Sequence, residues 1–211
     1  MKLPPLYPII DFSCFAAKPD PVHAMLQFAG VLLQSGITII QYRDKISAPQ
    51  RVLSVARELR RITRDGTRLI INDYSDLCLA CEADGVHLGQ EDLSPSAARA
   101  IFNAAKKQGL WTGFSTHNPE QVREADVLPI DYLAVGPVFA TSSKANPDPV
   151  IGLEGVKRAR KATSKPLVAI GGITRANCRQ VREAGADCVA VISDLIESPA
   201  KAVEDFLRIL E

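Results

Sequence analysis

Four short apolar segments of similar pattern recur along this 211-residue chain and constrain its fold more than any other feature. They read "SGITIIQYR", "EADGVHLG", "PIDYLAVG" and "GADCVAVIS", and they align on Ile37, Asp84, Asp131 and Asp187. The intervals from 37 to 84, from 84 to 131 and from 131 to 187 are 47, 47 and 56 residues. Each interval is long enough for two strand–helix units of about 24 residues, so the repeat predicts a further strand between each pair.

Apolar runs occupy the positions where these further strands are expected: 6–11, 68–73, 111–117 and 166–172. Helical patterns alternate with the strands, at 21–36, 48–66, 93–109, 118–126, 153–163, 174–185 and 198–211, with a short one in "SDLCLACEADG". Strands that alternate with helices imply an α/β protein with a parallel sheet. An open doubly wound sheet is an alternative, but the regular period and the eight strands favour a (β/α)₈ TIM barrel, one domain spanning residues 1–211.

The composition is that of an ordinary globular protein, 46% hydrophobic and 23% charged, with a formal net charge of +1. This balance argues against nucleic acid or a membrane surface as the main partner, because either would select a basic excess. No apolar run approaches the length of a membrane span, and "MKLPPLYPIIDF" has no signal-like block. We therefore expect a cytoplasmic protein whose five cysteines are reduced, with Cys78 and Cys81 of "CLAC" as buried thiols rather than metal ligands.

Polar or glycine residues follow every predicted strand. In a TIM barrel the carboxyl ends of the strands carry the chemistry, because there the side chains leave the packed interior. The residues at these ends are Asp11; Gln41, Arg43, Lys45; Asn72, Asp73; His87, Gln90, Asp92; Ser115, Thr116, His117; Thr141, Ser142, Ser143, Lys144; Gly171, Gly172; and Ile192, Ser193. Their convergence on one mouth predicts a functional site.

Two parts of this rim are suited to phosphate groups. Gly171 and Gly172 expose backbone N–H groups, and "SDLIE" after the eighth strand begins a short helix whose N-terminus favours an anion. The glycines alone are also explained by a tight strand–helix turn. Asp73 and Asp92 follow adjacent strands and form a candidate Mg²⁺ site, although each is equally suited to capping a helix. The cations Arg43, Lys45 and Lys144 complete a rim with two separate phosphate positions.

Several motifs, in this order, resemble those of the thiamine phosphate synthase family. They are "QYRDK", "INDYSDLCLACEADGVHLGQEDL", "STH", "DYLAVGPVFATSSK", "GLEG" and "VAIGGIT", and the resemblance runs from Leu6 to Ser198. It implies a (β/α)₈ barrel that uses Mg²⁺ to join 4-amino-2-methyl-5-(diphosphomethyl)pyrimidine to thiazole phosphate or its carboxylate. The products are thiamine phosphate and diphosphate, and the reaction passes through a pyrimidine carbocation.

The resemblance also implies roles for individual residues. The pyrimidine diphosphate is expected on Gln41, Tyr42, Arg43, Asp44, Lys45, Asn72, Ser115 and Lys144, and Mg²⁺ on Asp73 and Asp92. The thiazole phosphate is expected on Thr141, Ser142, Ser143, Gly172, Ile192 and Ser193. Arg43, Lys45, Ser115 and Lys144 form the expected catalytic set. No histidine is expected to be essential, and Asp44 is expected to orient a neighbouring cation.

Two departures from the family pattern bear on these roles. The loop "TSSK" stands where Thr-x-Thr-Lys is common, so Ser143 keeps a hydroxyl donor and loses a methyl group. The first strand reads "LYPIIDF" where "LYLITD" is usual, which leaves the role of Asp11 open.

Other functions fit the same barrel. A thiazole tautomerase-like relative would lack the full magnesium and diphosphate set, and a catalytically silent phosphate-binding barrel would not need two metal carboxylates. A Schiff-base aldolase needs a lysine inside a strand, and none of the eight strand cores has one. The assembly of identical subunits and the preferred thiazole form stay open.

Overall fold

The computed structural model describes residues 2–63, 66–141 and 148–211, and it is a closed barrel of parallel strands in sequence order, β1 to β8. The strands are β1 Leu6–Asp11, β2 Ile39–Arg43, β3 Arg68–Asn72, β4 Gly85–Leu88, β5 Trp111–Thr116, β6 Tyr132–Val135, β7 Leu167–Ile170 and β8 Cys188–Val191. β1 also pairs with β8, which closes the barrel. The predicted (β/α)₈ architecture is confirmed.

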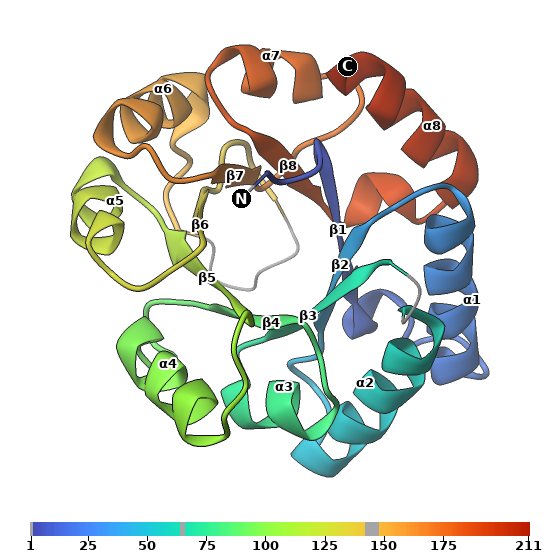
Figure 1. The fold of residues 1–211 in the computed structure, drawn as a ribbon. Helices are drawn as coiled ribbons and strands as arrows, with labels where there is room; N and C mark the ends of the chain where they lie inside the picture. The colour runs from blue at the N-terminus through green and yellow to red at the C-terminus, as the bar shows by residue number, and fades with distance from the viewer. Residues whose placement is uncertain (1, 64–65, 142–147) are drawn as a thin grey trace.

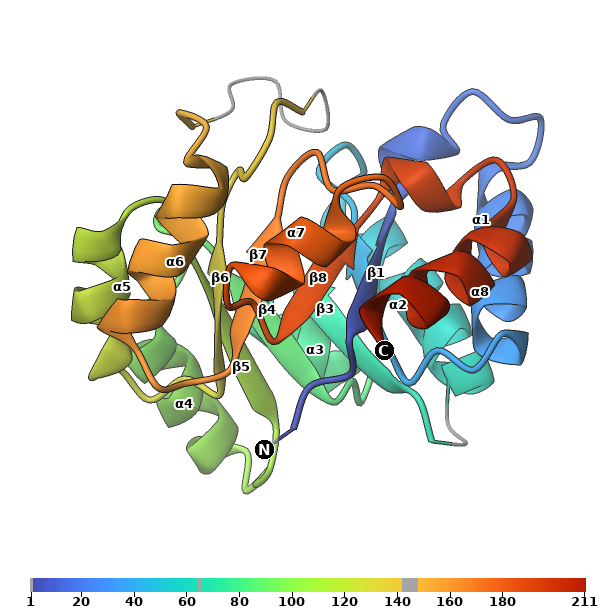
Figure 2. The same cartoon turned by 90° about the horizontal axis from the view of Figure 1, so that it is seen from above.

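Helices surround the sheet on its outer side (Figure 1). They are α1 Pro21–Gln34, α2 Pro49–Thr63, α3 Ser75–Ala80, α4 Pro95–Ala104, α5 Pro119–Asp126, α6 Gly152–Ala162, α7 Cys178–Glu183 and α8 Pro199–Leu210, with the 3₁₀ turns η1 Phe12–Cys14 and η2 Ser193–Leu195. Figure 2 shows η1 and η2, which follow β1 and β8, along the edge opposite the N-terminus. No helix in the described ranges combines the length and apolar composition needed to cross a bilayer.

Three of the helices begin where the sequence places a polar residue directly before a proline. The side chains of Asp20, Ser94 and Asn118 accept hydrogen bonds from the backbone N–H three residues further on. Each side chain satisfies one backbone N–H in the first turn of its helix. The proline that follows has no N–H and therefore needs no acceptor. The predicted helix at 174–185 is shorter than expected and begins at Cys178, because Asn177 instead organises a loop that belongs to the site.

The apolar side chains form two cores, one on each side of the barrel wall. Leu59, Phe102 and Phe206 belong to the larger core, between sheet and helices. Tyr7, Ile70, Tyr132 and Val168 belong to the core inside the barrel, which is therefore filled rather than open. Cys78 and Cys81 are buried in the larger core, and burial raises the pKa of both thiols, in agreement with the sequence expectation.

The aspartates of the sequence repeat make the same contact three times at the amino ends of the strands. Asp84, Asp131 and Asp187 precede β4, β6 and β8, and each accepts the backbone N–H of a residue in the preceding strand, at 2.8, 2.7 and 2.8 Å. Each carboxylate also pairs with an arginine of a helix, namely Arg60, Arg99 or Arg160. We call these three units the aspartate clamps. They join two strands and a helix, which explains why the repeat recurs.

Loss of one clamp is expected to weaken the fold without touching the mouth. Asp131→Ala leaves the Thr112 N–H without its acceptor and removes the ion-pair partner of Arg99, which keeps the Pro129 and Leu110 carbonyls, so the free energy of unfolding should fall by about 2 kcal/mol. Urea denaturation followed by circular dichroism measures the change. The exposed Glu124, on the helix before this clamp, provides the control, and Glu124→Ala should shift stability by less than about 0.5 kcal/mol. Equal shifts in the two variants would contradict the role of the clamp.

Candidate active site

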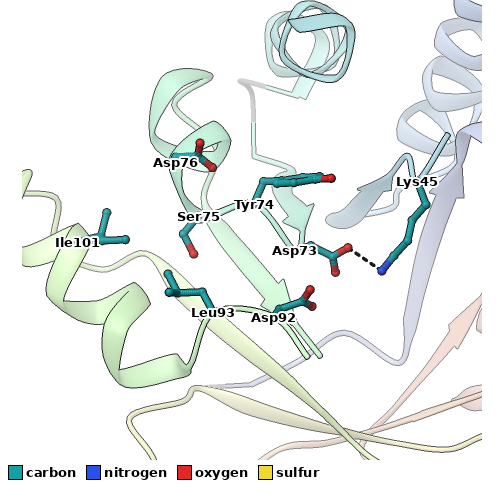
Figure 3. Close-up of a pocket in the computed structure, with 8 residues that line it drawn as sticks. All are labelled: Lys45, Asp73, Tyr74, Ser75, Asp76, Asp92, Leu93 and Ile101. Carbon is teal, nitrogen blue, oxygen red and sulfur yellow. Dashed lines mark ion pairs between the residues drawn. The ribbon is translucent and has the colours of Figure 1, made fainter. Parts of the chain in front are cut away.

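Two carboxylates and a lysine converge at the carboxyl ends of β2, β3 and β4. Figure 3 shows Asp73, Asp92 and Lys45 directed into the same space, with the Lys45 Nζ 2.8 Å from Asp73 Oδ2. The Asp92 carboxylate accepts a hydrogen bond from the backbone N–H of Gly89, at 2.7 Å. Asp73 has a φ of 66°, in the left-handed region, and its N–H donates to the His87 carbonyl at 2.8 Å. A short polar side chain tolerates this backbone, which turns the carboxylate toward the mouth.

The electrostatics of this pair favour a bound cation. Burial raises the pKa of Asp73, the hydrogen bond from Lys45 lowers it, and the nearby Asp92 raises it again. The net shift is upward, so the charged form of Asp73 is only partly compensated by Lys45. A hard cation between the two carboxylates would supply the missing compensation.

The donor set matches magnesium. The described residues contain no cluster of three or more His, Cys, Asp or Glu side chains that would form a complete protein cage. Mg²⁺ does not need one, because it retains water and is usually bound through one or two carboxylates and substrate phosphates. Asp73 and Asp92 therefore fit Mg²⁺ in type and number of ligands. They line an open cavity of about 490 Å³ that extends between α3 and α4, where Leu93 and Ile101 form an apolar wall.

Arg43 is held at the end of β2 by Asp11 at the end of β1. The two residues are opposite each other in the sheet register, and their side chains form an ion pair. Asp11 is only 2% exposed, and it also accepts hydrogen bonds from the backbone N–H and the hydroxyl of Ser13, at 3.0 and 2.6 Å. The role that the sequence left open for Asp11 is therefore to position the Arg43 guanidinium.

Asp44 shapes the loop between Arg43 and Lys45. Its buried carboxylate accepts hydrogen bonds from the Tyr42 hydroxyl at 3.1 Å and from the backbone N–H groups of Ile46 and Ser47, both at 3.0 Å. The expectation was that Asp44 orients a neighbouring cation, whereas these donors to its carboxylate are a hydroxyl and two backbone amides. Its substrate contact, and that of Tyr42, stay predictions.

Further polar side chains from three strands meet inside the upper part of the barrel. Gln41 on β2, His87 on β4 and Ser115 on β5 are connected through the hydroxyls of Tyr7 and Tyr132. Sequence reasoning found the first three and missed both tyrosines. A signal existed, because a tyrosine within an apolar strand usually finds a hydrogen-bond partner for its hydroxyl. Asn72, half-buried at the end of β3, lies beside His87 in the register.

The glycine pair after β7 meets the loop after β6 at very close range. Gly171 and Gly172 have φ values of 101° and 62°, which disfavour any other residue. A Cβ on Gly172 would lie 2.4 Å from the Ala140 carbonyl oxygen, and one on Gly171 would lie 2.5 Å from the Pro137 side chain. The absence of side chains lets the two loops pack together at this side of the mouth.

The loop after β7 is also tied to η2 after β8. Asp194 in η2 accepts from Arg175 Nε at 3.0 Å, Nη2 at 3.2 Å and the backbone N–H at 2.8 Å. Asn177 donates to the Gly172 carbonyl at 3.0 Å and accepts from the Thr174 N–H at 2.8 Å. These contacts connect the loop that contains Gly172 to the turn that begins at Ser193. Sequence reasoning missed Arg175, Asn177 and Asp194, since nothing in their spacing links them.

The remaining predicted positions are distributed as follows. Thr141 ends the described part of the loop after β6, whereas Ser142, Ser143 and Lys144 fall outside the described residues. His117 contacts the Gly136 carbonyl through Nδ1 at 2.7 Å, and His23 lies exposed on α1. The described rim thus contains the two carboxylates, two of the three cations and the glycine turn.

Comparison with known proteins gives consistent matches along the chain. The family model for thiamine monophosphate synthase matches residues 12–195. A thiamine-phosphate synthase of Koribacter versatilis is 50% identical over 210 residues, which cover 100% of this chain and 97% of that protein. One of Methanoregula boonei is 46% identical over 195 residues, covering 92% and 86% of the two chains.

Solved structures agree with these matches. A thiamine phosphate pyrophosphorylase from Pyrococcus furiosus superimposes with a TM-score of 0.82 at 33% identity, covering 98% of this chain and 95% of that one. A 3-hexulose-6-phosphate synthase, with a TM-score of 0.71 and 17% identity, shares the fold alone.

Proposed function

This chain belongs to the thiamine monophosphate synthase family, transferases that release diphosphate, and we propose that the barrel mouth joins a pyrimidine diphosphate to a thiazole phosphate. The observation that carries this proposal is the Asp73–Asp92 pair beside Lys45. Near it, Arg43 of β2 forms an ion pair with Asp11 of β1. Such a grouping suits an anionic leaving group with a bound divalent cation. We further propose that the enzyme acts in the cytoplasm.

The pyrimidine diphosphate half of the site is assigned to the ends of β2 to β5. Arg43, positioned by Asp11, and Lys45 would donate to the diphosphate, together with Ser115 and, from sequence, Lys144. Asp73 and Asp92 would hold Mg²⁺, which when bound supplies positive charge that stabilises the departing diphosphate. Lys45 lies 50% exposed and contacts Asp73, so its ammonium is free to turn from the carboxylate to the substrate.

The thiazole phosphate half is assigned to the opposite side of the mouth. The backbone around Gly172 and the Ile192–Ser193 segment would bind the phosphate, and the Arg175–Asp194 pair would keep the two segments in register. Thr141, Ser142 and Ser143 would complete this half. Two separate anion positions allow both substrates to be bound at once with their reactive ends facing the barrel axis.

The chemistry then needs positioning and charge stabilisation more than acid–base catalysis. The bond between the pyrimidine methylene carbon and the diphosphate oxygen breaks first, and its electron pair leaves with diphosphate. The aminopyrimidine delocalises the resulting cation, and the lone pair of the thiazole nitrogen forms the new carbon–nitrogen bond. Arg43 and Lys45 stabilise the charge that develops on the leaving group. No side chain has to remove a proton in these steps.

A diphosphate-release assay tests this function. With both substrates and Mg²⁺ present, we expect steady release that stops when either substrate or the metal is omitted. Gly172→Ala should raise KM for thiazole phosphate by about tenfold or more and leave KM for the pyrimidine diphosphate nearly unchanged, because a Cβ there meets the Ala140 carbonyl. Binding of thiazole phosphate without any diphosphate release would instead support a catalytically silent barrel.

A further inference from the structure

A continuous series of hydrogen bonds crosses the barrel interior from Gln41 to Ser115. Gln41 Nε2 lies 3.1 Å from the Tyr7 hydroxyl, which lies 3.1 Å from the Tyr132 hydroxyl. The Tyr132 hydroxyl lies 3.1 Å from His87 Nδ1, and His87 Nε2 lies 2.9 Å from Ser115 Oγ. We call these five residues the lumen chain. Both of its ends, on β2 and β5, are predicted substrate-binding residues.

The interior members of the chain are shielded from solvent. Tyr7 and Tyr132 are 1% and 0% exposed, and His87 is 8% exposed, with its ring stacked on that of Tyr132 at a centroid distance of 5.5 Å. Both ring nitrogens of His87 face hydroxyl groups rather than carboxylates. Burial lowers the pKa of His87 by more than the nearby Asp92 carboxylate raises it, which favours a neutral imidazole with one donor and one acceptor nitrogen.

The amide nitrogen of Gln41 sets the direction of every bond in the chain. This nitrogen can only donate, so the Tyr7 oxygen accepts and the single Tyr7 proton goes to Tyr132. Tyr132 then has its own proton to give to His87 Nδ1. The remaining imidazole proton must sit on Nε2 and point to Ser115 Oγ. Ser115 therefore accepts from inside the protein, and its own proton is available to the mouth.

Resting on the proposed function, we propose that the lumen chain is a one-way hydrogen-bond relay that holds the Ser115 hydroxyl as a donor to the substrate diphosphate. Tyr132 and His87 are positioning residues in this relay, and no proton is transferred along it. If the Gln41 amide were flipped so that its oxygen faced Tyr7, the donor and the acceptor of each hydrogen bond would be exchanged. Ser115 would then have to donate to His87, and it would present only lone pairs to an anionic substrate.

Space for the central contact depends on the absence of a side chain at one position. A Cβ on Gly113 of β5 would lie 2.1 Å from Tyr132 Cζ and 2.5 Å from His87 Nδ1. The glycine thus gives the Tyr132 hydroxyl and the imidazole room to meet. This is an independent structural requirement for the same bond.

The tautomer of His87 gives a direct test in the unaltered protein. The chain has three histidines, so a long-range ¹H–¹⁵N spectrum is sparse, and His87→Gln identifies the signal. We expect the Nε2–H tautomer at neutral pH. The Nδ1–H tautomer would mean the reverse direction and would overturn the proposal, whether or not the protein releases diphosphate. A failure of the release assay would instead concern the proposed function alone.

Tyr132→Phe tests the effect of the relay on turnover, because it removes the hydroxyl and keeps the ring. We expect kcat for diphosphate release to fall about three- to tenfold, the effect of one hydrogen bond. The same substitution in a Ser115→Ala background should have almost no effect on kcat, because the group through which it acts is gone. An equal fold-loss in the two backgrounds would overturn the proposal.

The control is Thr112→Val on β5. This hydroxyl is buried and has no hydrogen-bond partner within the described part of the chain. Thr112→Val, like Tyr132→Phe, removes one buried hydroxyl group. We expect it to leave both kcat and the His87 tautomer unchanged. A matching loss of kcat in Thr112→Val would assign the Tyr132 effect to general packing and overturn the relay.

Discussion

Asp73→Asn is expected to lower diphosphate release by about a hundredfold or more while the protein stays fully folded, because a magnesium ligand is lost. Stability should be maintained or should rise at neutral pH. The pKa of Asp73 is raised in the fold, so the unfolded chain ionises this carboxyl more easily, and its contribution to stability falls as pH rises through the folded pKa. Asparagine removes that cost and also tolerates the left-handed backbone at φ 66°.

Thermal unfolding with and without Mg²⁺ separates the two effects. The unaltered protein should unfold at a higher temperature when Mg²⁺ is added, because a ligand of the native state stabilises it, and Asp73→Asn should lose this shift. Asp20→Asn is the control, since it removes the same charge from an exposed helix cap that asparagine also forms. Near-normal diphosphate release in Asp73→Asn would refute the metal assignment.

Asp11→Asn is expected to reduce both activity and stability through Arg43. Asparagine can still accept from Ser13 but does not neutralise the guanidinium, so a partly buried charge loses its partner. We expect the free energy of unfolding to fall by about 3 kcal/mol, and kcat/KM for the pyrimidine diphosphate to fall about tenfold to a hundredfold. Denaturant unfolding and steady-state kinetics measure the two quantities.

Repeating Asp11→Asn in a protein that already lacks the Arg43 charge shows whether Asp11 acts through Arg43. In an Arg43→Gln protein the charge is absent, so adding Asp11→Asn should cost much less kcat/KM than it does in the unaltered protein. An equal loss in both backgrounds would mean that Asp11 contacts the substrate itself, and its positioning role would be wrong.

Most of the fold could be predicted from the repeat at Asp84, Asp131 and Asp187. The structure explains why the pattern is readable, since each aspartate bonds a neighbouring strand and pairs with a helix arginine. Each aspartate and the backbone N–H that it accepts are 15 to 20 positions apart in the sequence. Both partners of this hydrogen bond therefore lie within one short segment of the chain. Position 37 has isoleucine, which is why the first repeat is weaker.

Composition alone did not place every helix boundary. The pattern at 174–185 is helical by composition, yet the helix begins only at Cys178. Asn177 uses its side chain for Gly172 and Thr174 instead. A tertiary hydrogen bond therefore outweighed the local preference, and periodicity does not reveal such competition.

The alternation of strands and helices, the strand ends and the polar residue types at the mouth could be predicted from the sequence, because they depend on local composition and on parallel-sheet geometry. Which side chains meet depends on the closed barrel: Asp11 meets Arg43, Arg175 meets Asp194, and Tyr7 meets Tyr132, 125 positions apart. Contacts of this kind form when the sheet closes and brings strands distant in the chain around one axis. No spacing along the chain encodes them.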